Sequence, residues 1–204
     1  MVAPVPDPGA SGVLIPGLNP AQREAVLHEG GPLLVVAGAG SGKTRVLTHR
    51  IAYLIDERQM SPFSVLAITF TNKAAEEMKH RVADLVGPVA HQMWVSTFHS
   101  ACVRMLRRHA GRIGFPSRFS IYDQADALRL ITHVLRDLNI DAKQFPSRSV
   151  HAAISSAKNE GTSASDYAER ATGPFEQRVG RVFVEYQARL VSAGAMDFDD
   201  LLVN

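Results

Sequence analysis

The sequence contains a single cysteine, Cys102, among its 204 residues. This excludes a disulfide framework and a four-cysteine zinc site. Its longest apolar run, Pro32 to Ala39, is far shorter than the roughly 20 residues that span a bilayer. The first residues lack the basic and apolar segments of a signal peptide. A net charge of +2 is too small to indicate a partner. These absences favour a soluble, cytoplasmic protein.

The 46% of hydrophobic residues can form a core in one domain or two small ones. Prolines and glycines predict a disordered tail over residues 1–17. Beyond the tail, apolar periodicity predicts alternating strands and helices. Three consecutive strand–helix units predict a parallel sheet covered by helices. The expected pairs are strand 33–37 with helix 43–58, strand 64–70 with helix 72–86, and strand 93–97 with a helix that ends near residue 110.

After about residue 121 the pattern becomes helical, with helices expected over 123–139, 148–159 and 175–193 and no intervening strands. Gly111, Gly114 and Pro116 interrupt the periodicity, which predicts a boundary within residues 112–122.

A glycine-rich run, Ala37 to Thr44, lies between an expected strand and an expected helix, which is the context of a phosphate-binding loop. Its glycines let successive backbone N–H groups converge on an anion at the positive end of a helix. Lys43 can reach the β- and γ-phosphates, and the Thr44 hydroxyl can coordinate Mg²⁺. Ala37 departs from the glycine that usually begins the motif. A glycine-rich turn with an incidental lysine is the alternative, and the motif alone leaves kinases, GTPases, transporters and motors open.

Upstream of the loop, Asn19, Pro20 and Gln22 have the spacing of a helix N-terminus, with Gln22 at the third helical position. The Gln22 amide could therefore cap the helix. We favour capping on the local residues alone; the alternative is that the amide pairs with the edge of adenine, because it carries a donor and an acceptor side by side.

Polar and aromatic residues follow the second and third expected strands, where ligand crevices of open α/β sheets form. Phe70 offers a stacking surface for a base, and Thr71 and Asn72 can bind phosphate. Alternatively, Phe70 ends the strand core and Thr71 or Asn72 caps the next helix. At the following strand end, Thr97 caps a helix or donates to a phosphate, and His99 is structural or binds a nucleic-acid backbone.

Charge is unevenly distributed along the chain. Between residues 70 and 120, eight basic residues against three acidic ones give a local charge of +5, which supports phosphate binding, although solvated helix faces would explain about half of them. The eight basic residues are Lys73, Lys79, Arg81, Arg104, Arg107, Arg108, Arg112 and Arg118.

The sequence gives no indication of a metal site formed by histidines or by the acidic run near its end. The histidines have no metal-ligand spacing, so no zinc or iron site is expected. Asp197 and Asp200 have the spacing of a helix cap, which we favour over metal ligation.

Five segments together, in order and spacing, resemble the superfamily 1 helicases of the UvrD, PcrA and Rep type. They are residues 18–26 (LNPAQREAV), 37–44 (AGAGSGKT), 68–78 (ITFTNKAAEEM), 97–100 (TFHS) and 197–202 (DFDDLL).

The resemblance implies an ATP-driven motor that moves 3′ to 5′ on single-stranded DNA and unwinds duplex DNA, with ATP and Mg²⁺ as cofactors. It implies a RecA-like P-loop domain with a parallel sheet over residues 18–115, a mainly helical insertion over 116–196, and a return to the first domain over 197–204. Single-stranded DNA would contact Phe70, Thr71, Asn72, Thr97, Phe98 and His99. The ATP site would comprise Gln22, Ala37, Gly38, Ala39, Gly40, Ser41, Gly42, Lys43, Thr44 and Arg45, with Thr44 on Mg²⁺ and Lys43 and Thr44 as the catalytic residues.

Hydrolysis also needs an acidic strand end and a carboxylate that positions water, and no Asp-Glu pair follows an apolar strand after the loop. We therefore expect the N-terminal part of a helicase that binds MgATP weakly and does not hydrolyse it on its own. The alternatives are a nucleotide- and DNA-binding module without turnover, or part of a helicase–nuclease.

Overall fold

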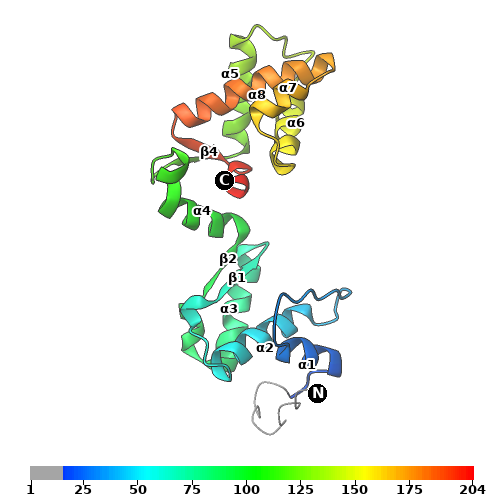
Figure 1. Ribbon diagram of the computed structural model, residues 1–204, viewed down its shortest axis with the longest axis vertical. Coiled ribbons are helices and arrows are strands. Elements are labelled where there is room, and N and C mark those ends of the chain that lie inside the picture. The colour runs from blue at the N-terminus through cyan, green and yellow to red at the C-terminus, as the bar shows by residue number, and fades with distance from the viewer. Residues whose placement is uncertain (1–15) are drawn as a thin grey trace. The chain divides into compact units, whose positions relative to one another are not determined.

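The computed structural model describes residues 16–204. Of the predicted disordered tail, residues 1–15 lie outside the described part. The chain divides into two compact units between Phe98 and His99, at the first residue of helix α4 (Phe98–His109) (Figure 1). The domain bounds expected from the sequence, at residues 115 and 196, stay a prediction.

The first unit is a mixed α/β structure with a short parallel sheet. Strand β1 pairs in parallel with β2, in a register that places Leu66 beside Trp94 and Thr69 beside Thr97. This confirms two of the three expected strand–helix units. Its elements are α1 (Pro20–Leu27), α2 (Lys43–Asp56), η1 (Pro62–Ser64), β1 (Leu66–Thr69), α3 (Asn72–Val86), η2 (Pro88–Gln92) and β2 (Trp94–Thr97).

Helix α3 follows directly from its sequence. The Thr71 side chain accepts a hydrogen bond from the Ala74 backbone N–H and so caps the first turn. The helix ends at Gly87, whose φ of +77° suits glycine. Between these ends, apolar residues at helical spacing face the core of the unit. That core is formed by Ile51, Ile55, Val65, Ala67, Ala75, Met78, Val82, Ala90, Met93 and Val95.

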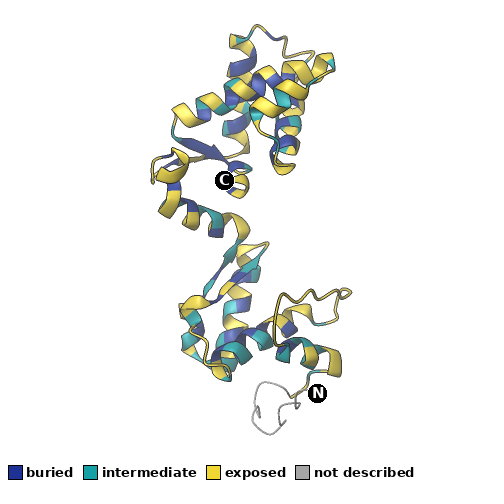
Figure 2. Cartoon of the chain, viewed as in Figure 1, coloured by how far each residue is buried: buried dark blue, intermediate teal, exposed yellow. Residues whose placement is uncertain are grey.

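The strand expected over residues 33–37 is not formed, so this prediction is wrong. The segment belongs to neither of the two sheets of the described residues, and it is exposed (Figure 2). Leu34 and Val36 are 86% and 87% exposed, whereas Leu33 and Val35 are about half as exposed and line a cavity beside α2. This alternation is typical of an extended chain with one face on a helix. A strand additionally requires a hydrogen-bonded neighbour, and no described segment provides one.

The second unit joins a helical bundle to a second short parallel sheet, β3 with β4, in which Ser120 pairs with Ala195. The three expected helices are confirmed as α5, α6 and α8. Sequence reasoning missed α7 and both strands. The elements after α4 are η3 (Ala110–Ile113), β3 (Ser120–Tyr122), α5 (Gln124–Asp137), α6 (Ser147–Asn159), α7 (Ala164–Arg170), α8 (Pro174–Ser192), β4 (Ala195–Asp197) and α9 (Asp200–Val203).

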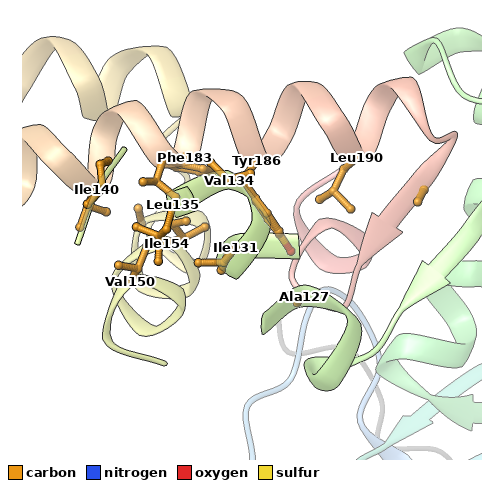
Figure 3. Packing of buried hydrophobic residues seen from close by; sticks show 14 residues of the cluster. Ala127, Ile131, Val134, Leu135, Ile140, Val150, Ile154, Phe183, Tyr186 and Leu190 are labelled. Carbon is orange, nitrogen blue, oxygen red and sulfur yellow. The ribbon is translucent and has the colours of Figure 1, made fainter. Parts of the chain in front are cut away.

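The bundle core is built around α8, which is the longest helix of the described chain at 19 residues. Figure 3 shows Phe183, Tyr186 and Leu190 of α8 among apolar side chains of α5 and α6. A smaller cluster joins the end of α4 to the sheet strand β4 and to α9. The smaller cluster consists of Leu106, Ala110, Phe115, Phe119, Met196 and Leu201.

Gly180, buried in α8, allows α7 to pack very closely. A Cβ added to Gly180 would lie 2.9 Å from the Cα of Ala168. Alanine favours a helix by about 1 kcal/mol over glycine, but here it would press against backbone. We expect Gly180→Ala to lower the free energy of unfolding by about 1–3 kcal/mol, measured by urea denaturation. Gly111→Ala is the control, since its added Cβ meets nothing within 4 Å. A stabilised Gly180→Ala variant would contradict this packing.

Candidate functional site

The glycine-rich loop leads into the N-terminus of α2, which confirms the helical half of its expected context. Gly40 and Gly42 have φ values of +74° and +84°, which side chains other than glycine rarely adopt. Gly42 is also close to Gln22, because an added Cβ would lie 2.8 Å from the Gln22 Nε2 atom. Glycine at position 42 therefore allows both the turn of the loop and its contact with α1.

Lys43 reaches back over the loop. Its Nζ atom donates hydrogen bonds to the carbonyl oxygens of Ala37, at 2.7 Å, and Gly38, at 2.6 Å. The Ser41 hydroxyl donates to the Gly38 carbonyl, at 2.7 Å. Phosphate oxygens could replace these carbonyls as acceptors of the Lys43 ammonium, because they are stronger partners for a cation.

The first turn of α2 fits a phosphate and its metal. Thr44 is exposed in this turn, and a hydroxyl there is a suitable oxygen ligand for Mg²⁺. The free backbone N–H groups of the turn carry the positive end of the helix dipole. Arg45 is exposed and its guanidinium lies beside Gly17.

Gln22 caps α1 and contacts the loop. Asn19 and Gln22 form a reciprocal capping box, with distances of 2.8 Å and 3.1 Å between backbone nitrogen and side-chain oxygen. The Gln22 Nε2 atom donates to the Ser41 carbonyl oxygen at 2.9 Å. The capping role expected from the sequence is confirmed, and contact with adenine stays a prediction.

Two aromatic rings lie close together at the ends of the parallel strands β1 and β2. Phe70 follows β1 and is 88% exposed, so its assignment to the strand core is excluded. Its ring centroid lies 5.5 Å from that of Phe98, which follows β2 and is 43% exposed. Thr71 caps α3, as one of its two expected roles required, and Asn72 is the first, exposed residue of that helix. Thr97 ends β2.

In the second unit, His99 is exposed and packs against a ring that sequence reasoning missed. The ring of Phe198 lies edge-on to the imidazole, with 5.6 Å between centroids. Phe198 is 46% exposed. The sequence signal for Phe198 is an aromatic residue inside an acidic run, a run that the spacing of its aspartates identifies as a helix cap.

The basic residues between positions 70 and 120 have mixed roles. Arg81 and Lys79 form ion pairs with acidic residues on their own helix, α3. Arg107 donates to the Ser117 carbonyl and lies 4.2 Å from the centre of the Phe119 ring. Part of the local positive charge is therefore used within the protein, as expected.

Asp197 and Asp200 bond to each other as a cap would. The Asp200 N–H donates to Asp197 at 2.8 Å, and the Asp197 N–H donates back at 3.3 Å. The expected positions in the helix, Asp197 as N-cap and Asp200 as third residue, are wrong, because α9 begins at Asp200 and Asp197 ends strand β4. Sequence reasoning missed their cation: Lys158 of α6, only 4% exposed, donates to both carboxylates at 2.7 Å. Tyr186 donates to Asp197 at 2.8 Å.

This buried cluster places two carboxylates beside one ammonium, and their pKa values are shifted in opposite directions. Burial raises the pKa of Asp200 above its ordinary value, and the charge of Asp197 raises it further. Burial also opposes ionisation of Asp197, but the charge and hydrogen bond of Lys158 outweigh it and hold the pKa of Asp197 below its ordinary value. The cluster joins α6, α8, β4 and α9.

No helix within residues 16–204 is long and apolar enough to cross a membrane. The fold and site define a mixed α/β protein in which a phosphate-loop sequence at a helix N-terminus is combined with an exposed aromatic pair at the ends of parallel strands.

Comparison with known proteins gives the family. Residues 18–204 match the UvrD/REP helicase N-terminal domain, and the chain belongs to this family, which confirms the resemblance. It is 53% identical over 193 residues to the ATP-dependent DNA helicase PcrA of Bacillus subtilis (strain 168), covering 95% of this chain and 26% of that protein. It is 54% identical over 190 residues to the protein of the same name from Staphylococcus aureus (strain Mu50 / ATCC 700699), covering 93% and 26% respectively. The chain thus spans about a quarter of the length of these relatives.

Proposed function

We propose that the chain is the ATP- and single-stranded DNA-binding part of an ATP-dependent DNA helicase that moves 3′ to 5′ on single-stranded DNA. The observation that carries the DNA half of this proposal is the Phe70–Phe98 pair, because two neighbouring exposed rings at the ends of adjacent parallel strands offer bases a stacking surface where ligands of open α/β sheets bind. The family and the phosphate loop support the ATP half. The parallel α/β unit is consistent with a RecA-like P-loop domain, and the helical bundle with its insertion.

Nucleotide binding would use the loop and α1 together. The backbone N–H groups of the loop and the first turn of α2 would bind phosphate oxygens, and Lys43 would exchange its two carbonyl acceptors for them. Mg²⁺ would be held by the Thr44 hydroxyl and supply a positive charge at the β- and γ-phosphates. Gln22, held at the loop through Ser41, would offer its amide to the edge of adenine.

Single-stranded DNA binding would use the strand ends. Successive bases would stack on Phe70 and Phe98, since any base presents a flat face to an aromatic ring. Thr71, Asn72 and the N-terminus of α3 would bind the adjoining phosphates. Thr97 and His99 would contribute hydrogen bonds to the DNA backbone.

The stacking role of Phe70 is tested by replacing it with alanine. We expect Phe70→Ala to weaken binding of a fluorescent oligothymidine about 5- to 150-fold in an anisotropy titration, because base–aromatic stacking contributes about 1–3 kcal/mol. Phe63→Ala is the matched control, since Phe63 is 77% exposed in η1 of the same unit and should leave the affinity unchanged. Equal losses in both variants would show that the aromatic pair is not a DNA platform.

A further inference from the structure

Arg50 of α2 lies two helical turns beyond Lys43 and outside the segments that carry the family resemblance. Its Nη1 atom lies 2.9 Å from the carbonyl oxygens of Val26 and His28, and 3.2 Å from that of Ala25. Ala25 and Val26 are in the last turn of α1, and His28 is its C-cap. The last carbonyls of a helix lack intrahelical donors, so one guanidinium, itself partly buried, satisfies the end of α1 and places a cation at its negative pole.

Helix α1 is therefore tied at both ends to the segment that forms the phosphate loop and α2. At its N-terminus, Gln22 donates to the Ser41 carbonyl of the loop at 2.9 Å. At its C-terminus, Arg50 binds three carbonyls. Between them, Val26 is fully buried. A helix of eight residues is marginal on its own, so these contacts determine where α1, and with it the Gln22 amide, lies.

We propose that Arg50 is a positioning residue for the nucleobase: by capping α1, it holds the Gln22 amide at the phosphate loop, where adenine is read. This inference rests on the proposed function. Removing the guanidinium takes away the two Nη1 hydrogens that the three carbonyls share and releases the C-terminal end of α1, so Gln22 is no longer held at its place beside the loop. The groups that would bind the triphosphate are Lys43, which bonds to carbonyls of its own loop, and the backbone N–H groups of the loop and of α2. None of these groups belongs to α1, so binding of the triphosphate group is expected to persist.

The test uses calorimetry to measure the binding of two probes, each in the presence of Mg²⁺. One probe is ATP, and the other is inorganic tripolyphosphate, which lacks a base. Arg50→Met keeps the apolar stem and is expected to weaken ATP binding about 5- to 20-fold, the loss of one or two hydrogen bonds, without changing tripolyphosphate binding. Arg50→Lys, which keeps the charge, should recover part of the ATP affinity and also serves if Arg50→Met fails to fold. Arg81→Met is the control, because Arg81 forms only a surface pair with Glu77.

A double-mutant cycle with Gln22 separates positioning from a purely structural role. If Arg50 acts through Gln22, then Gln22→Ala combined with Arg50→Met binds ATP no more weakly than Gln22→Ala alone. Additive losses, or equal losses for ATP and tripolyphosphate, overturn the inference while the proposed function stands. A wild-type chain that binds neither probe overturns the proposed function, and the role of Arg50 with it.

Discussion

Lys43→Ala is expected to abolish binding of MgATP while the chain stays folded. Hydrogen bonds to charged groups contribute about 1.5–3 kcal/mol each, so loss of the ammonium at two phosphates corresponds to at least about a 100-fold weaker affinity. The side chain is exposed and its observed partners are the carbonyls of its own loop. Its removal therefore leaves the core of the first unit intact. Calorimetric titration with MgATP measures the affinity, and thermal unfolding by circular dichroism measures the fold.

Lys79→Ala provides the matched control for this experiment. Lys79 carries the same charge in the same unit and pairs on the surface of α3 with Glu76, at 3.4 Å. Its replacement removes one positive charge from the unit but none from the loop. We expect its affinity for MgATP to equal that of the wild-type chain. An unchanged affinity in the Lys43→Ala variant would refute the assignment of residues 37–44 as a phosphate-binding loop.

All the longer helices were predictable from the sequence because their signals are local, and the seven-residue helix α7 was missed. Helix α3 begins and ends where its pattern predicted, since Thr71 supplies the cap and Gly87 the stop. Strands depend on partners elsewhere in the chain. Residues 33–37 have strand composition but no hydrogen-bonded neighbour among the described residues, whereas the three-residue strand β3 exists because residues near Gly194 return to pair with it.

The residues of the candidate site show the same difference between features set by local sequence and features set by distant partners. The turn of the loop and the cap formed by Gln22 depend on residues a few positions apart, and both were predicted. The exposure of Phe70 excludes one of the two interpretations that its sequence context left open, the end of the strand core, and stacking on a base stays a prediction. The role of Lys158 was not predictable, because a lysine at this position of an amphipathic helix has the composition of a solvated surface. Only the return of β4 and α9 to α6 buries it.

Lys158→Met is expected to destabilise the second unit by about 3–5 kcal/mol, because it leaves two buried carboxylates without their cation. Methionine preserves most of the volume, so a cavity does not account for the loss. Urea denaturation followed by circular dichroism measures it. Arg129→Met is the control: Arg129 pairs with Asp126 on the surface of α5, and its replacement should change the free energy of unfolding by less than about 0.5–1 kcal/mol.

The two carboxylates should respond differently to neutralisation. The pKa of Asp197 is lowered from its ordinary 3.8, so its stabilising contribution is present above pH 3.8 and is lost as the pH falls through the folded value. The pKa of Asp200 is raised, so its contribution is complete below its ordinary pKa and is lost as the pH rises through the folded value. At pH 7, therefore, Asp200→Asn should cost less stability than Asp197→Asn. Combining Lys158→Met with both asparagine substitutions should recover part of the stability, since no uncompensated charge remains buried. A Lys158→Met variant as stable as the Arg129→Met control would mean that the ammonium does not balance these carboxylates.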